Sequence, residues 1–132
     1  MQLIYGYGLV ALLFIAVDAL WLSAMVPRLY RPALGDLIAP EPNLAAAAAF
    51  YLVYPVGLVA FAIQGALASG VAGQAFLNGA LFGGLAYATY DLTNMATLRH
   101  WSLAVTIVDI GWGAFASGLA AFVATVILQR WA

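Results

Sequence analysis

Four long apolar runs, separated by shorter polar stretches, organise the sequence. They cover, approximately, residues 3–25, 44–67, 74–96 and 102–128. At a helical rise of about 1.5 Å per residue, each run is long enough to cross the roughly 30 Å hydrocarbon core of a bilayer. The only substantial polar loop spans residues 27–43. The pattern predicts an all-α, polytopic membrane protein, with a single transmembrane domain over residues 1–132 and four transmembrane helices in a compact bundle.

Local signals refine these boundaries. Pro27 is expected to end the first helix, and Asn43 is expected to cap the second. Gly79 and Gly83 form a small-xxx-small stripe in the third run. Such a stripe lets two helices approach closely. It predicts a contact face that lies either inside the bundle or in a homodimer.

Composition supports the membrane interpretation. Of the 132 residues, 67% are hydrophobic and 7% are charged, whereas about a quarter of the residues in soluble domains are charged. The net charge is −1 and all four basic residues other than histidine are arginines, so there is no basic stripe and no nucleic-acid partner is expected. The sequence contains no Cys and no Lys, which excludes disulfides, thiolate chemistry and lysine Schiff bases. The expected partner is the lipid bilayer, and no cofactor is expected.

Three acidic residues interrupt the apolar runs: Asp18, Asp91 and Asp109. Ionisable residues inside a membrane are expensive and mark functional sites by default. Counted from the ends of the runs that face the first and third loops, each lies roughly 9–11 Å deep at about 1.5 Å per residue. Three helices are therefore predicted to bring three carboxyl groups to one layer. Burial and neighbouring like charges favour the neutral form, so at least one of the three is expected to be protonated at pH 7.

Aromatic and amide side chains accompany these acids. Tyr90 and Asn94 flank Asp91 on one side of a helix, and a Val-Asp-x-x-Trp pattern places a tryptophan three residues after each of the other two acids. Tyr54 comes near the same depth. The candidate ligand- or proton-binding set is Asp18, Asp91, Asp109, Asn94, Tyr90, Trp21, Trp112 and Tyr54. The alternative is that the acids are only hydrogen-bonded staples between helices. Three acids at one depth favour a pocket.

No motif assigns catalysis or a metal. The sequence has no phosphate-binding glycine loop, no zinc-protease histidine motif and no serine-nucleophile motif. His100 follows Arg99 in a tight loop and is interpreted as an exposed loop residue. No local spacing of ligands supports a metal site, so none is predicted. The catalytic residues of any enzymatic activity are left unassigned.

Several blocks of the chain resemble a known family. The run Tyr90-Asp91-Leu92-Thr93-Asn94 is similar to the signature of small four-helix proteins of the bacterial inner membrane, known only as a domain of unknown function. The blocks that begin at Asp18, Phe50 and Val108 resemble the family's other blocks in the same order. The resemblance implies a standalone multi-pass protein of the bacterial inner (plasma) membrane. It implies no established activity.

Arginine placement predicts the orientation. Arg28, Arg31 and Arg99 lie in the first and third loops, whereas Arg130 lies at the opposite end of the last run. Cytoplasmic loops carry the excess of Lys and Arg in membrane proteins. The first and third loops are therefore predicted to be cytoplasmic, with both termini outside.

The leading functional hypothesis is binding or transport of a small, partly apolar or amphipathic molecule in an intramembrane Asp/Trp/Tyr pocket, with proton linkage as an extension. One alternative is a membrane enzyme that acts on a lipid or isoprenoid, with Asp91 as general base or with Asp-bound Mg²⁺ as Lewis acid. Carboxyl groups close together beside a groove that opens sideways to lipid would favour it. A second alternative is a structural or accessory membrane subunit.

Overall fold

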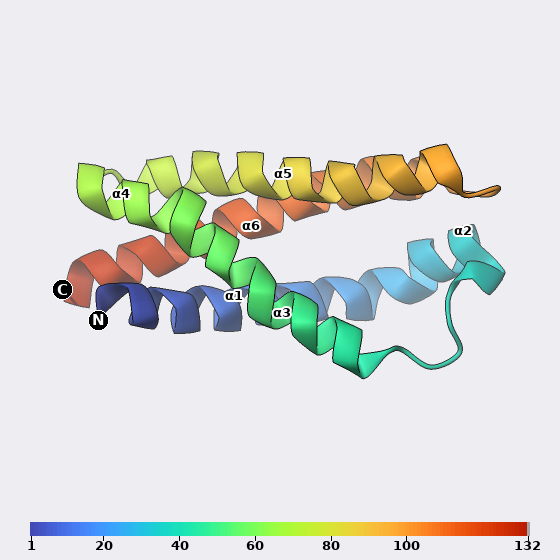
Figure 1. Ribbon diagram of the computed structural model, residues 1–132, viewed down its shortest axis with the longest axis horizontal. Helices are drawn as coiled ribbons and strands as arrows, with labels where there is room; N and C mark the ends of the chain where they lie inside the picture. Colours follow the sequence, from blue (N-terminus) through green and yellow to red (C-terminus); the bar gives the residue numbers. More distant parts are fainter. Residues whose placement is uncertain (132) are drawn as a thin grey trace.

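The computed structural model describes residues 1–131, and all regular secondary structure in that range is helical (Figure 1). The first segment is α1 (Gln2–Met25), η1 (Val26–Tyr30), α2 (Arg31–Leu34) and η2 (Gly35–Leu37). The second is α3 (Leu44–Leu58), η3 (Val59–Ile63) and α4 (Gln64–Ser69). Two long helices follow, α5 (Ala72–Thr97) and α6 (Leu103–Trp131). Both ends of the described chain lie at the same end of the molecule (Figure 1).

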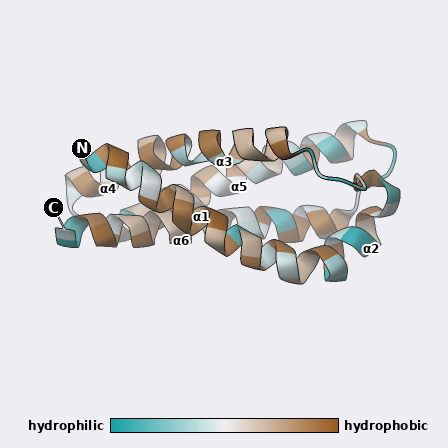
Figure 2. Ribbon diagram, turned by 90° about the horizontal axis from the view of Figure 1, so that it is seen from below, coloured by the Kyte–Doolittle hydropathy of each residue, from teal (hydrophilic) through white to brown (hydrophobic). Residues whose placement is uncertain are grey.

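Three stretches are long and apolar enough to cross a membrane: Gln2–Leu37, Leu44–Ser69 and Leu103–Trp131. The fourth long helix, α5, has 26 residues and a lower hydrophobicity, because Gln74, Asn78, Asp91 and Asn94 interrupt it. Hydrophobic residues follow the long helices, and hydrophilic residues gather around α2 and the neighbouring loops (Figure 2). The molecule therefore has an apolar body with one polar, loop-bearing end.

Small residues bring α5 and α6 into backbone contact. A Cβ atom on Gly83 would lie 2.3 Å from the carbonyl oxygen of Gly113, and one on Gly79 would lie 2.9 Å from that of Ser117. Real side chains do not tolerate such distances, so only glycine fits at Gly83 while the two backbones keep this separation. The stripe predicted from the sequence thus packs inside the chain, against α6, and is not free to form a homodimer contact.

The first α-helix ends at Met25, as predicted, but the helical backbone continues beyond it. Pro27 does not stop the helix, because the backbone widens there into the π-helical turn η1 and continues into α2. The backbone N–H of Arg31 bonds to the carbonyl of Val26, five residues earlier. Proline has no N–H for the carbonyl four residues earlier, and a π-helical turn shifts the bonding pattern by one residue. The π-helical turn positions Tyr30 so that its hydroxyl contacts Trp21 of α1, in the site described below.

The second segment begins as predicted and then leans across the bundle. Asn43 caps α3 through a 3.1 Å bond from the backbone N–H of Ala46 to its side-chain oxygen. Pro55 lies inside α3, and the π-helical turn η3 follows it. In Figure 1, α3 crosses α1 obliquely and draws away from α5 toward the loop-bearing end. The second segment packs on α5 mainly through η3, which leaves the two helices apart nearer the loops.

Candidate functional site

The three acids of the apolar runs lie on the wall of one cavity of about 160 Å³. Asp18 comes from α1, Asp91 from α5 and Asp109 from α6. Six aromatic side chains complete most of the wall: Trp21, Tyr30, Tyr87, Tyr90, Trp101 and Trp112. The structure therefore joins three carboxyl groups, from three helices, in a single aromatic-walled space toward the loop-bearing end.

Asp18 is fully engaged by neighbouring donors. The indole N–H of Trp112 donates to its Oδ1 at 3.0 Å, and the hydroxyl of Tyr51 donates to its Oδ2 in a short hydrogen bond. The residue is 6% exposed. Because α1, α3 and α6 each supply one member of this group, Asp18 ties three helices together. Its role in the fold is at least that of a structural acceptor.

Asp109 receives a relay of hydrogen bonds from the first segment. The hydroxyl of Tyr30 donates to its Oδ1 at 2.7 Å, and the indole N–H of Trp21 donates to the same hydroxyl at 3.1 Å. The rings of Trp21 and Trp112 stack, with centroids 4.3 Å apart and planes 7° from parallel. Trp112 on α6 thus donates directly to Asp18 on α1. Trp21 on α1 is linked to Asp109 on α6 through the hydroxyl of Tyr30.

Asp91 is different, because nothing satisfies it. Its side chain is 0% exposed, and neither carboxyl oxygen has a hydrogen-bond donor among the described residues. Its carboxyl group lies within hydrogen-bonding reach of that of Asp109. Two ionised carboxylates are both acceptors, so this pair can bond only when one of them holds a proton. A buried polar group without a hydrogen-bond partner destabilises the folded protein by about 1–3 kcal/mol. Such groups are rare in native structures, and an unpaired one calls for an explanation such as a functional role.

Basic groups are absent from the cavity wall. The described residues that line it include no Arg and no His. Arg99 and His100 instead line a neighbouring open depression of about 810 Å³ among the loops, together with Asp36, and this depression shares Leu34 and Trp101 with the cavity wall. Across residues 1–131, no three His, Cys, Asp or Glu side chains are grouped so as to hold a metal ion. The cavity is therefore an acidic and aromatic environment.

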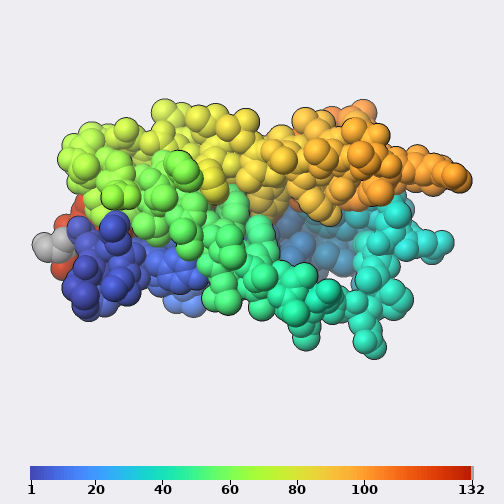
Figure 3. All heavy atoms as spheres, in the orientation of Figure 1, coloured from blue at the N-terminus to red at the C-terminus, as the bar shows by residue number. Residues whose placement is uncertain are grey.

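An apolar cleft adjoins the cavity between α3 and α5. It has a volume of about 380 Å³ and is lined by Phe50, Tyr54, Ala86, Tyr87, Tyr90 and Asp109. Phe50 and Tyr90, at its rim, are 39% and 57% exposed, so the cleft opens on the side of the helices. Figure 3 shows this face hollowed between α3 and the C-terminal half of α5. The cavity and the cleft adjoin each other, because both are lined by Tyr87, Tyr90 and Asp109.

Two predicted site residues fall outside the cavity wall. Asn94 does not line it. Tyr54 lines the cleft instead, and its hydroxyl shares a 2.6 Å hydrogen bond with Ser117. The other six predicted residues, Asp18, Asp91, Asp109, Tyr90, Trp21 and Trp112, all line the cavity.

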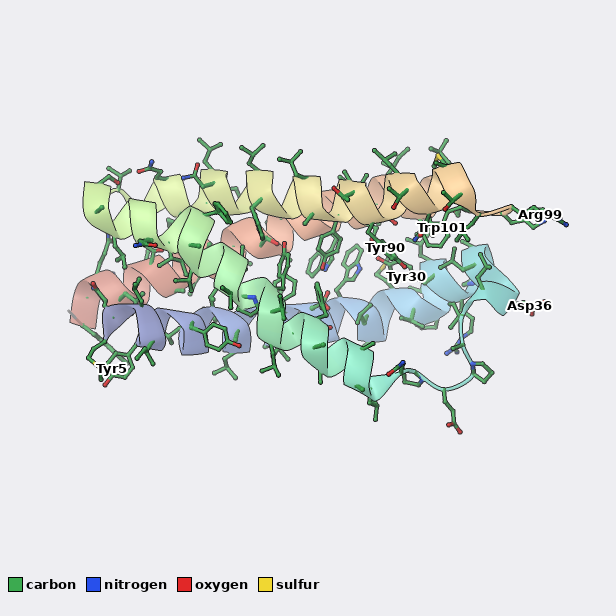
Figure 4. The ribbon with its side chains drawn as sticks, viewed as in Figure 1. Tyr5, Tyr30, Asp36, Tyr90, Arg99 and Trp101 are labelled. Carbon is green, nitrogen blue, oxygen red and sulfur yellow. The ribbon has the colours of Figure 1, made fainter. Side chains whose placement is uncertain are left out.

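Sequence reasoning missed four aromatic residues at the site: Tyr30, Tyr51, Tyr87 and Trp101. Figure 4 shows the rings of Tyr30, Tyr90 and Trp101 directed into the space between α1 and α5, whereas Asp36 and Arg99 point away. Tyr30 was hidden by the stop expected at Pro27. Trp101 resembles a residue of the membrane interface, but its indole N–H bonds to Thr106 at 3.0 Å and its ring lines the cavity.

Replacing Asp18 with leucine is expected to destabilise the fold by about 1–3 kcal/mol, because it leaves the donors of Tyr51 and Trp112 buried and unpaired. The measurement is thermal unfolding of the purified protein in detergent. Asp36→Leu, at an exposed position in η2, is the matched control. A melting temperature for Asp18→Leu equal to that of the control would contradict the structural role of this acid.

These features define a class: an all-helical, multi-pass membrane protein with an acidic cavity in its helical body. Residues 3–126 match the family described as predicted membrane protein (DUF2177). The match covers nearly the whole sequence, and the chain belongs to this family, whose function is unknown. No curated protein and no solved structure gives a significant match. The family identity therefore agrees with the resemblance found in the sequence, and the function has to be argued from the site.

Proposed function

We propose that the protein binds a small, partly apolar molecule in the cavity around Asp91 and moves it across or within the membrane, with protons as the coupling ion. The observation that carries this proposal is the Asp91 carboxyl group, which is fully buried, without a donor, and on the wall of a cavity. A group of this kind needs a partner that the protein itself does not supply. A ligand and a proton are the two partners that fit it.

The neighbouring acids support the proton part of the proposal. Asp91 and Asp109 lie close enough for one proton to bridge them. Binding of a ligand donor at Asp91 would remove the need for that proton. Loading and proton release would then be linked at the same pair of carboxyl groups.

The same proposal includes the arrangement in the membrane. The long helix α5 pairs along its length with α6, so it crosses the bilayer with α6 as a fourth span, and the four spans form a bundle within a single transmembrane domain. We place the protein in the bacterial inner membrane with the loops 27–43 and 98–102 in the cytoplasm. Because the natural chain has no cysteine, single cysteines introduced at Asp36 and Gly70 can test this by labelling from either side. Labelling of position 70 from the cytoplasm would reverse the orientation.

The binding proposal is tested by tryptophan fluorescence. Three of the four tryptophans line the cavity, and Trp131 is 84% exposed at the end of α6. In Trp131→Phe protein every remaining indole reports on the cavity wall. Titrating this protein in lipid nanodiscs with a panel of cationic, neutral and anionic amphipathic compounds should give a saturable change for at least one class. Asp91→Leu in the same background should lose that change.

Two results would overturn the proposal. One is a panel in which no class of compound gives saturation. The other is saturation that persists unchanged for every class of compound that binds, charged or neutral, when Asp91 is replaced, since binding would then not involve this acid. Linear changes that scale with lipid content report partitioning into the bilayer and count as absence of binding.

A membrane enzyme that acts on a lipid or isoprenoid is the second candidate, favoured by the cleft that opens sideways beside Asp109. In that case Asp91 would serve as the general base for a substrate whose chain lies in the cleft. Incubation of the purified protein with native lipids, followed by mass spectrometry, tests it. A product that forms with the parent protein and not with Asp91→Asn would support catalysis. Identical lipid profiles for the two proteins would rule out the enzyme hypothesis.

A further inference from the structure

We infer that the ligand of this cavity is a hydrophobic amine: a protonated primary or secondary amine that donates to Asp91, with its apolar part in the cleft between α3 and α5. The inference rests on the proposed function and specifies its ligand class. Its starting point is the contrast among three acids on one wall. Asp18 and Asp109 already accept bonds from Tyr and Trp donors, and only Asp91 has none.

The charge of the wall selects the charge of the ligand. The described lining residues carry three carboxyl groups and no basic side chain. Buried charges are paired in proteins, and an anionic ligand would add to an unpaired negative potential. Aromatic ring faces also attract cations, and six aromatic side chains surround these acids. Charge and ring chemistry therefore both favour a cation.

The two oxygens of Asp91 select the kind of cation. Neither oxygen has a hydrogen-bond donor, so a head group with N–H bonds satisfies them directly. A quaternary ammonium group is attracted by the same charge and the same rings, but it has no N–H to donate. Two oxygens without a donor call for two N–H groups, which protonated primary and secondary amines have and tertiary and quaternary ones lack.

The sizes of the cavity and the cleft indicate which part of the ligand each can hold. The cavity, at about 160 Å³, is similar to an engineered cavity of about 150 Å³ that holds one benzene, and is smaller than the roughly 300–1,000 Å³ of drug-sized sites. It has room for a head group only. The adjoining cleft, at about 380 Å³, has room for an aromatic or branched aliphatic group between Phe50 and Tyr87. An inorganic cation would leave this cleft without an occupant.

The cleft also gives the ligand a route from the lipid. Hydrophobic amines concentrate in membranes, where the apolar part lies among the acyl chains. Because the rim residues Phe50 and Tyr90 are exposed on the side of α3 and α5, such a molecule can pass from the bilayer into the cleft without crossing the loops. Its charged end then meets Asp109 and Asp91 at the inner boundary.

The pH dependence follows from the groups that face the cavity. They are Asp18 on α1, Tyr30 on η1, Tyr87, Tyr90 and Asp91 on α5, and Asp109 on α6. Tyrosines and alkyl amines ordinarily titrate near pH 10, so both keep their protons at neutral and acidic pH. Protons compete with the amine for Asp91, and binding of the amine should therefore strengthen as the pH is raised from acidic to neutral.

The test uses three probes that share one phenylbutyl chain: phenylbutylamine, phenylbutanol and phenylbutyrate. Each is titrated into Trp131→Phe protein in nanodiscs of zwitterionic lipid, with the fluorescence of the cavity indoles as readout. The amine is expected to bind at least tenfold more tightly than the alcohol or the carboxylate. Asp91→Asn should weaken amine binding by about thirtyfold or more and leave binding of the alcohol within about twofold.

Two further variants locate the apolar part. Phe50→Ala should weaken binding of the amine by about threefold or more, because it removes an aromatic wall of the cleft. Leu52→Ala, on the lipid-facing side of the same helix and 63% exposed, is the matched control and should bind as the parent does. Equal losses in both variants would overturn the placement of the ligand in the cleft.

The outcomes separate this inference from the proposed function. Saturable, Asp91-dependent binding that favours phenylbutanol or phenylbutyrate overturns the amine and leaves a binding protein. Absence of saturable binding by all three probes overturns the amine as well, and the wider compound panel then decides the proposed function. A trimethylated phenylbutylamine that binds as tightly as the primary amine would overturn the N–H contact to Asp91. Asp91→Glu, which keeps the charge, should retain the preference for the amine.

Discussion

Asp91→Asn is expected to remove most of the pH dependence of ligand loading while the protein stays folded and gains thermal stability. In the parent, a buried carboxyl group without a donor destabilises the fold by about 1–3 kcal/mol, and it binds a proton in competition with the ligand. Asparagine has no proton to exchange and supplies its own N–H donors toward Asp109. The measurements are ligand titrations at several pH values and thermal unfolding in the same detergent.

The comparison with Asp18 makes this result diagnostic. Both acids line the cavity, yet removal of Asp18 strands two donors whereas removal of Asp91 strands none. Loss of stability at Asp18 and gain at Asp91 would show that the second acid is kept at a cost to the fold, as functional groups often are. If Asp91→Asn melted below the parent, or if its loading followed pH as the parent's does, the role assigned to Asp91 would be wrong.

Gly83→Leu is expected to prevent assembly of α5 with α6 and to yield no folded protein. Even a single Cβ atom at this position would lie 2.3 Å from the carbonyl oxygen of Gly113 and 2.4 Å from the hydroxyl of Ser117. Overpacking of a core by a few methylenes costs about 1–3 kcal/mol where side chains can adjust, and here the obstacle is backbone. The yield of monodisperse protein in size-exclusion chromatography measures the effect.

The control lies on the same helix. Gly73 has nothing within 4 Å of its Cβ position, so Gly73→Leu should express and elute as the parent does. Insertion into the membrane should be unaffected in either variant, because both substitutions raise the hydrophobicity of α5. Normal elution of Gly83→Leu would mean that the helices do not pack at the separation described above.

The convergence of the acids could be foreseen because it depends only on helical rise. Asp18, Asp91 and Asp109 are each about two turns from one end of an apolar run, and helices crossing the same layer must bring them to similar depth. The family, the all-helical fold and the cap at Asn43 were readable from composition and local pattern for similar reasons. These features need no knowledge of how the helices rotate about their axes.

The partners of the acids depend on that rotation and were not predictable. Tyr51 lies one turn before Tyr54, and only the oblique course of α3 decides that the first reaches Asp18 while the second faces Ser117. Tyr30 required a π-helical turn where proline usually indicates an end. Asn94 was included because it follows Asp91 on the helix face, but it is not among the residues that line the cavity.

The glycine contacts between α5 and α6 have a mechanical consequence. Two helices joined backbone to backbone behave as one rigid frame, so the contents of the cavity can be exchanged only if the opposite wall shifts. That wall is formed by the first segment, which reaches the cavity through Asp18 and Trp21 on α1 and Tyr30 on η1. Turnover should therefore survive a covalent tether from α5 to α6 and stop when α1 is tethered to α5, which makes the first segment the moving part of any transport cycle.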